Sequence, residues 1–323
     1  MDDFINAHLG IVIQKQERMR SGYYYWNIIG KIAQLCAKVY DPVVTKKIGQ
    51  KYLLMHLSHQ LPYSIAANPY YDSILPRICS FLKENQGYLT MIEIGANIGD
   101  TVSLITDKTS GEFLLIEPSD KFFPLLLKNT LKIANTHCEK IIIDETVSFS
   151  DSRLVTYSGT ARVSAEKTDS KGLDKISLDN FVEKFPAFLR TNMLKIDTDG
   201  YDYKVLRSAA RLLDSAKPAL FFELSPLHLS YYGEEPFSIF DFLSAKGYEK
   251  VLFYDNTGYP LIFIKTCDIE YIRQILNYSY IKGNIYFDVL AIHSAYNEQF
   301  NQFHKMELAF YPKYKRPELQ NII

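Results

Sequence analysis

Met91-Ile-Glu-Ile-Gly-Ala-Asn-Ile-Gly-Asp-Thr101 is the stretch that decides the fold. A short apolar run leads into a glycine loop, and the loop is followed by a segment typical of a helix start. Because glycine has no side chain, Gly95 and Gly99 let the backbone turn sharply and approach a ligand closely. The N–H groups at the start of the helix face the same place. The pattern predicts a strand, a tight loop and a helix that together contact a nucleotide-like ligand.

A second acid follows at an informative distance. Glu117 ends the next apolar run, Phe113-Leu-Leu-Ile-Glu117, and lies 22 positions after Gly95. In nucleotide-binding βαβ units, an acid at about this distance accepts hydrogen bonds from ribose hydroxyls. The loop spacing differs from G-x-G-x-x-G, and Glu93 precedes the first glycine by only two residues. The loop and Glu117 together predict a site for a ligand that carries a ribose.

From Leu89 onward, short apolar segments alternate with amphipathic ones. This alternation indicates an α/β fold with a doubly wound, mostly parallel sheet and helices on both faces. We expect strands near residues 90–94, 112–117, 140–144, 192–197, 218–223, 248–254 and 284–292. We expect helices near 100–107, 121–134, 177–185, 201–214, 236–246 and 268–279, with Ser177 as the N-cap of the third. Asp255-Asn-Thr-Gly258 has turn chemistry and predicts a hairpin within 248–265.

The first part of the chain has a different pattern. Ile28, Ile32 and Leu35 recur at helical spacing, and we find no strand alternation before the sheet. We therefore predict a helical N-terminal extension over residues 1–75 and a ligand-binding domain over 76–323. The aromatic cluster Tyr23-Tyr-Tyr-Trp26 leaves three roles open: packing on the main domain, covering a ligand, or contact between copies in a homo-oligomer.

Three sequence blocks carry a resemblance to a known family. They are Glu93-Ile-Gly-Ala-Asn-Ile-Gly-Asp100, Leu194-Lys-Ile-Asp-Thr-Asp-Gly200 and Phe221-Phe-Glu223. In this order they resemble the FkbM family of S-adenosylmethionine-dependent methyltransferases, over roughly residues 50–265. The family usually has Asp-x-Glu-Gly where this chain has Asp197-Thr-Asp-Gly200. The resemblance implies a Rossmann-like methyltransferase sheet and S-adenosyl-L-methionine as the cofactor.

The resemblance and the chemistry of the residues together assign roles around this cofactor. The loop residues would approach its methionine part, Glu93 would hold its ammonium group, and Glu117 would accept hydrogen bonds from both ribose hydroxyls. Asp144, Glu145 and Thr146, at the end of the third expected strand, would lie along the edge of the adenine ring. The full predicted cofactor set is Glu93, Gly95, Asn97, Gly99, Glu117, Asp144, Glu145 and Thr146.

The expected catalytic residues also lie at strand ends. Methyl transfer requires alignment of the acceptor and, for a hydroxyl acceptor, removal of its proton. Asp197 and Glu223 are placed for this task, and Lys195 shares a strand face with Asp197 and could tune both acids. Simple pairing of Lys195 with a neighbouring acid is the equally weighted alternative. His59 and His228 are further candidates for the base.

A metal is a weaker hypothesis. Asp197, Asp199, Asp255 and Asn256 offer oxygen ligands that hard divalent cations prefer. The Asp-Asn pair, however, falls in the expected hairpin turn, so we predict no metal.

Composition narrows the class of protein. The 323 residues include 36 basic and 37 acidic ones, without a basic stripe of the kind that nucleic-acid binding needs. We find no apolar run near the ~18 residues of a membrane span, and Met-Asp-Asp does not begin a signal peptide. We therefore expect a cytoplasmic protein without a membrane span that acts on a small-molecule or glycan acceptor and does not bind nucleic acid.

The favoured function is methyl transfer, expected to oxygen. The resemblance implies O-methylation in natural-product or surface-polysaccharide biosynthesis. An NAD-dependent oxidoreductase is the first alternative, because both classes use a glycine loop and a ribose-binding acid. A non-catalytic module that keeps the methyltransferase-like fold for binding is the second.

Overall fold

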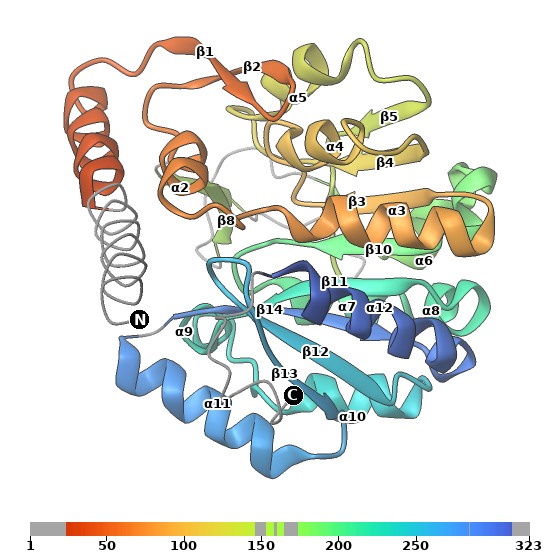
Figure 1. Cartoon of the computed structure of the whole chain (residues 1–323). Coiled ribbons are helices and arrows are strands. Elements are labelled where there is room, and N and C mark those ends of the chain that lie inside the picture. The colour runs from red at the N-terminus through yellow and green to blue at the C-terminus, as the bar shows by residue number, and fades with distance from the viewer. Residues whose placement is uncertain (1–23, 146–152, 158–159, 165–173, 284, 312–323) are drawn as a thin grey trace, which may run out of the picture.

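The structure is a computed structural model that describes residues 24–145, 153–157, 160–164, 174–283 and 285–311. Its centre is an eight-stranded sheet (Figure 1). In spatial order the strands are β13 (Pro260–Lys265), β12 (Lys250–Asp255), β14 (Phe287–Ile292), β11 (Ala219–Leu224), β10 (Met193–Ile196), β3 (Thr90–Ile94), β4 (Glu112–Ile116) and β5 (Thr136–Glu139).

The strand directions confirm the predicted mostly parallel sheet. All neighbours from β11 to β5 are parallel, whereas β14 runs antiparallel to both β11 and β12, and β13 pairs antiparallel with β12 as the expected hairpin. The strand order reverses at the β3–β10 pair, because the chain continues outward from β3 to one side and from β10 to the other. Ligands bind beyond the carboxyl ends of the strands at such a switch point.

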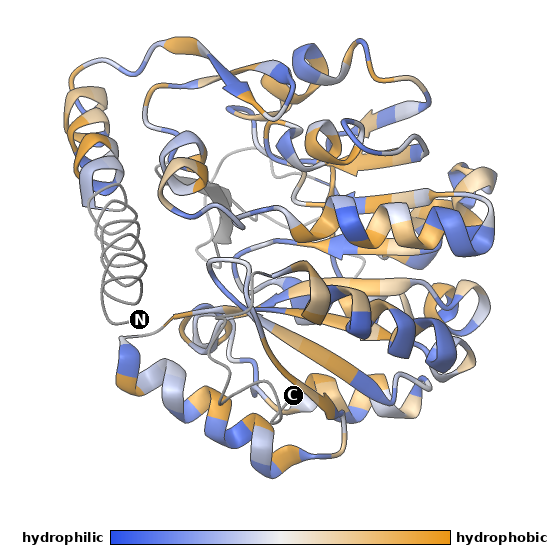
Figure 2. Ribbon diagram, viewed as in Figure 1, coloured by the Kyte–Doolittle hydropathy of each residue, from blue (hydrophilic) through white to orange (hydrophobic). Residues whose placement is uncertain are grey.

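Helices cover both faces of the sheet (Figure 1). One face packs against α3 (Ile74–Gln86), α4 (Asp100–Ile105), α5 (Phe123–Thr130) and α12 (Asn297–Phe310). The other packs against α6 (Leu178–Phe181), α7 (Asp202–Ser208), α8 (Ala210–Ala216), α10 (Ser238–Ala245) and α11 (Ile269–Lys282). Alternating strand residues supply the two cores, with Met91 on the first face and Ile92 on the second. Figure 2 shows that the inner strands are mostly apolar, whereas the helices carry both apolar and polar residues.

Local sequence signals explain several boundaries. Ser177 caps α6 as predicted, since its side chain accepts a hydrogen bond from the Asn180 N–H. Gly87 ends α3 in the left-handed conformation. The short elements are α9 (Pro226–Ser230), the 3-10 turns η1 (Val182–Lys184), η2 (Pro186–Arg190) and η3 (Ser294–Tyr296), the β6 (Ile142–Ile143)–β9 (Lys175–Ile176) pair and the β7 (Arg153–Tyr157)–β8 (Thr160–Ser164) hairpin.

The predicted third strand is wrong in its placement. The sheet strand is β5, which ends at Glu139, whereas Ile142 and Ile143 form β6 and pair with β9 outside the main sheet. The strand was predicted at Ile141-Ile-Ile143 because this run is more apolar than the segment before it. The more polar Thr136–Glu139 forms the sheet edge, where a strand pairs on one side only.

The expectation of an all-helical segment before the sheet is also incomplete. Residues 24–37 and α2 (Leu61–Ala67) are helical, but β1 (Val43–Ile48) and β2 (Lys51–His56) form an antiparallel hairpin. Val, Thr and Ile in β1 favour a strand, and Gly49 adopts the positive φ that the tight turn requires. The helix over 24–37 stands beside the main body in Figure 1, with Ile28, Ile32 and Leu35 exposed.

In the described part of the chain, we find no helix that is both long and apolar enough to cross a membrane.

Candidate active site

A cavity of about 300 Å³ lies at the carboxyl ends of the parallel strands. It brings together six of the predicted residues, which come from the loops and strand ends of β3, β4, β10 and β11: Gly95, Asn97, Glu117, Lys195, Asp197 and Glu223. The lining is strongly acidic. Its carboxylates are Asp72, Asp100, Glu117, Asp197, Asp199, Glu223 and Asp288, and among the described lining residues only Lys195 is a lysine or arginine.

The glycine loop is fixed from two sides. The N–H groups of Gly95 and Ala96 both donate to the Ile116 carbonyl, at 2.9 and 3.0 Å. Gly95 has a φ of +85°, and a Cβ at this position would lie 1.9 Å from the Asp197 carbonyl oxygen. Glycine is therefore required here because the loop packs directly against the end of β10. A side chain at position 95 would clash with the backbone of the protein itself.

Gly99 plays a packing role. It begins α4 with a φ of +82°, and an added Cβ would lie 2.8 Å from the Thr130 side chain on α5. It does not line the cavity. Its predicted contact with the cofactor stays a prediction.

Glu117 joins the loop to the cavity. Its Oε2 accepts from the Asn97 N–H and its Oε1 from the Ser119 N–H, both at 2.8 Å. Burial raises the pKa of Glu117 to about 7, although the two backbone hydrogen bonds oppose this shift. A carboxylate can accept about four hydrogen bonds, so Glu117 retains acceptor capacity towards the cavity that it lines.

Lys195 links two acids. Its Nζ lies 2.9 Å from Glu93 Oε1 and 3.1 Å from Asp197 Oδ2. Burial opposes the charged form, but Glu93, Asp197 and Asp100 raise the pKa of Lys195 well above its usual value, so it is held as a cation. Glu93 is fully buried and does not line the cavity. This position favours a role in holding Lys195 and does not favour the predicted contact with a ligand ammonium.

Apolar side chains, and not the predicted acids, line the cavity near the place expected for the adenine. Asp144 accepts from the Tyr201 hydroxyl at 2.6 Å and from Lys175 Nζ at 2.8 Å, and Glu145 forms an ion pair with Arg207. Neither acid lines the cavity. Thr146 lies outside the described residues. Apolar side chains line the cavity near this place: Pro118, Ile141, Ile142 and Ile143.

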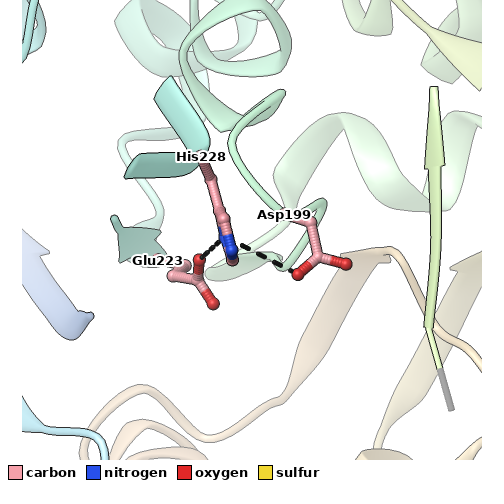
Figure 3. Close-up of side chains that lie close together, drawn as sticks. All are labelled: Asp199, Glu223 and His228. Atoms are coloured by element: carbon pink, nitrogen blue, oxygen red, sulfur yellow. Dashed lines mark hydrogen bonds and ion pairs between the residues drawn. The ribbon is translucent and has the colours of Figure 1, made fainter. Parts of the chain in front are cut away.

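Glu223 is paired with a histidine from the next helix (Figure 3). His228 Nδ1 lies 2.8 Å from Glu223 Oε1 and 3.7 Å from Asp199 Oδ1, between the two carboxylates. The turn at Asp199 has positive φ, and a Cβ on Gly200 would lie 2.5 Å from the His228 backbone, so this turn packs directly on α9. Burial raises the pKa of Glu223 well above its usual value, and Asp197 adds to the effect. The ligating atoms of the Asp199–Glu223–His228 triad lie within 4.8 Å of one another.

Of the oxygen set considered earlier for a metal, Asp197 and Asp199 line the cavity, whereas Asp255 does not. Asp255 Oδ1 accepts from the Thr257 and Tyr259 N–H groups and thereby holds the hairpin turn. Asn256 lines the cavity.

His59 also lines the cavity. Burial lowers its pKa to about 4, and its Nε2 lies 3.3 Å from Asn97 Oδ1.

Sequence reasoning missed one wall of the cavity. Tyr71 and Asp72, from the loop before α3, face Tyr286 and Asp288, from the β14 region, and the two tyrosine hydroxyls share a hydrogen bond. Burial raises the pKa of Asp72 to about 8, and Asp100 contributes. An acid inside the apolar strand Phe287–Ile292 was the one available signal for Asp288.

Residues 93–250, just under half of the chain, match the model described as the methyltransferase FkbM domain. The resemblance to the FkbM family is confirmed. The FkbM match covers the glycine loop, Glu117, Asp197, Glu223 and His228. It therefore includes most of the predicted residues that line the cavity.

Solved structures show more distant likenesses. Methyltransferase FkbM from Methylobacillus flagellatus is 16% identical with a TM-score of 0.31, and the match covers 49% of this chain and 36% of that one. Precorrin-6y C5,15-methyltransferase from Geobacter metallireducens is 12% identical over 64% and 81% of the two chains, with a TM-score of 0.34. Human methyltransferase 10 domain containing protein is 11% identical over 68% and 81%, with a TM-score of 0.35. No curated protein matches significantly.

Proposed function

We propose that the protein transfers a methyl group from S-adenosyl-L-methionine to a hydroxyl oxygen of a sugar or natural product. One observation carries the proposal: the glycine loop, Glu117, Asp197 and Glu223 meet on a single cavity at the switch in strand order. The same residues fall inside the FkbM match.

The cavity residues fit this cofactor. Glu117 offers carboxylate oxygens to a ribose beside the loop, and Ile141 to Ile143 offer an apolar surface to a purine. The acidic lining suits a molecule with positive sulfonium and ammonium groups. When bound, S-adenosyl-L-methionine supplies an electrophilic methyl group. We keep Asp144 and Glu145 only as residues that shape this end of the site, since their carboxylates bind Tyr201, Lys175 and Arg207.

Asp197 is our candidate for the group that aligns the acceptor and takes its proton. Its side chain lines the cavity and is 51% exposed, so a ligand can reach it. Lys195, anchored by buried Glu93, fixes the position of this carboxylate. Glu223 shapes the acceptor side through its contact with His228. Alignment of the hydroxyl and removal of its proton are the two tasks that the protein must perform.

The first test compares cofactors. Isothermal titration should give binding of S-adenosyl-L-methionine and no binding of NAD⁺. Binding of NAD⁺ alone would support the oxidoreductase alternative and contradict the proposal.

The second test separates binding from chemistry. With an acceptor found by screening sugars and natural products, Asp197→Asn should leave cofactor affinity nearly unchanged and reduce turnover by about 10²- to 10⁴-fold. Loss of cofactor affinity with unchanged turnover per bound cofactor would assign Asp197 to cofactor binding. An acceptor screen that shows cofactor binding but no turnover would favour the binding-module alternative.

A further inference from the structure

Three side chains converge on the acceptor side of the cavity from separate elements. Asp199 lies in the turn after β10, Glu223 lies in β11 near its end, and His228 lies in α9 (Figure 3). We propose that the Asp199–Glu223–His228 triad binds a divalent transition-metal ion. The existence of this site does not depend on the proposed function, whereas its role in the reaction does.

The geometry requires little change. Ligands at about 2.0–2.2 Å from one metal ion lie about 3–4 Å from one another. The His228 nitrogen is already 2.8 Å from Glu223 and 3.7 Å from Asp199, and the set lies within 4.8 Å. The close packing of Gly200 on the His228 backbone fixes the turn that carries Asp199 against α9. Side-chain rotation could therefore close the site without movement of the elements.

The chemistry of the ligands selects the kind of ion. One imidazole nitrogen and two carboxylates suit Mn²⁺, Fe²⁺, Co²⁺ or Zn²⁺, whereas Mg²⁺ prefers a set of oxygens. All three residues line the cavity, so the remaining coordination positions would face the acceptor. Metal ligands bind in their deprotonated forms, so a bound cation would compete with protons for His228 and the two carboxylates.

The charges around the triad point to the same conclusion. Asp72, Asp197 and Asp288 also line this cavity. Lys195 is already committed to Glu93 and Asp197. A histidine within two carboxylates, in a cavity with further acids and one committed lysine, is therefore better matched to a metal ion than to an isolated role as base.

The ion would also solve a chemical problem of the proposed reaction. A carboxylate, with an ordinary pKa near 4, is a weak base towards an alkyl hydroxyl. Coordination lowers the pKa of a hydroxyl oxygen. The proton would pass to Asp197, the oxygen would form the new bond to the methyl carbon, and the methyl–sulfur bond would break to leave a neutral thioether.

The experiment uses Mn²⁺ and the full chain after removal of metals by chelator and dialysis. Electron paramagnetic resonance measures free aquo-Mn²⁺, whose signal falls as the ion binds. We expect one bound Mn²⁺ per chain. Asp199→Asn and His228→Gln should each weaken binding by more than about tenfold, whereas Asp72→Asn, a matched change in the same cavity outside the triad, should change it by less than about threefold.

Binding of S-adenosylhomocysteine, measured by titration calorimetry for every variant, shows that the site is still folded and tests the proposed function separately. Absence of a stoichiometric Mn²⁺, or an equal effect of Asp72→Asn and Asp199→Asn, would overturn the metal site. Retained Mn²⁺ binding without S-adenosylhomocysteine binding in the unmodified protein would contradict the proposed function and leave the metal site standing.

Discussion

Lys195→Met tests whether the buried Glu93–Lys195 ion pair supports the site. Methionine keeps most of the length of the side chain but removes its charge, which leaves Glu93 fully buried without its cation. Breaking a buried pair in this way costs about 3–5 kcal/mol. The contact with Asp197 adds less than about 1 kcal/mol, because that carboxylate is half exposed to water. The predicted loss is a large part of the roughly 5–15 kcal/mol that stabilises a typical domain.

Urea unfolding followed by circular dichroism measures this loss. Burial already raises the pKa of Glu93, and loss of Lys195 should raise it further. A raised carboxyl pKa means that the folded state holds a proton more tightly than the unfolded state, so lower pH favours folding. The loss should therefore be larger at pH 8 than at pH 5.5.

The double variant Glu93→Gln/Lys195→Met is the control. It removes both charges of the buried pair, so we expect it to be clearly more stable than Lys195→Met alone. If its loss equals the sum of the two single losses, the side chains do not interact and the reasoning is refuted.

Three further predictions concern ligand binding by Glu117, the packing of Gly95 and the pH dependence of stability. Glu117→Gln should weaken binding of S-adenosylhomocysteine by at least about tenfold in calorimetry, since a hydrogen bond to a charged group contributes about 1.5–3 kcal/mol. Unchanged affinity would remove Glu117 from the ribose role. Gly95→Ala should lower the free energy of unfolding by at least about 2 kcal/mol more than Gly87→Ala. Both glycines have positive φ, but only at position 95 would the added Cβ lie against a backbone atom, 1.9 Å from the Asp197 carbonyl oxygen. Equal losses in urea unfolding would contradict this prediction. Glu117 and Asp202, with pKa values raised to about 7, and Asp72, raised to about 8, stabilise the folded state below pH 4 and lose this contribution as pH rises through 7 to 8. The melting temperature of the ligand-free protein should thus fall from pH 5 to 8.5, and a rise over this range would show that these carboxyls are not buried as described.

The part of the site that could be predicted from the sequence is formed by segments close together in the chain or by neighbouring parallel strands. Gly95, Asn97 and Glu117 come from one strand–loop–helix–strand unit, where spacing alone fixes which groups meet. Asp197 and Glu223 end neighbouring parallel strands, and parallel strands place their carboxyl ends at one edge of the sheet. Periodicity and turn chemistry therefore carried this part of the prediction.

The rest of the site depends on tertiary arrangement. Asp72 and Asp288 are separated by most of the chain, and only the packing of the loop before α3 against β14 brings them to one cavity. His228 was one of two lone histidines in the sequence analysis, and its approach to Asp199 depends on how closely the Gly200 turn packs on α9. The β1–β2 hairpin and the register of β5 were missed because short, partly polar strands lack a clear apolar signal.

A crystal structure of the complex with S-adenosylhomocysteine tests the central claim most directly. We predict that both ribose hydroxyls lie within hydrogen-bond distance of the Glu117 carboxylate and that the sulfur faces the part of the cavity lined by Asp197. A ligand bound elsewhere, or a ribose without contact to Glu117, would contradict the proposed cofactor site.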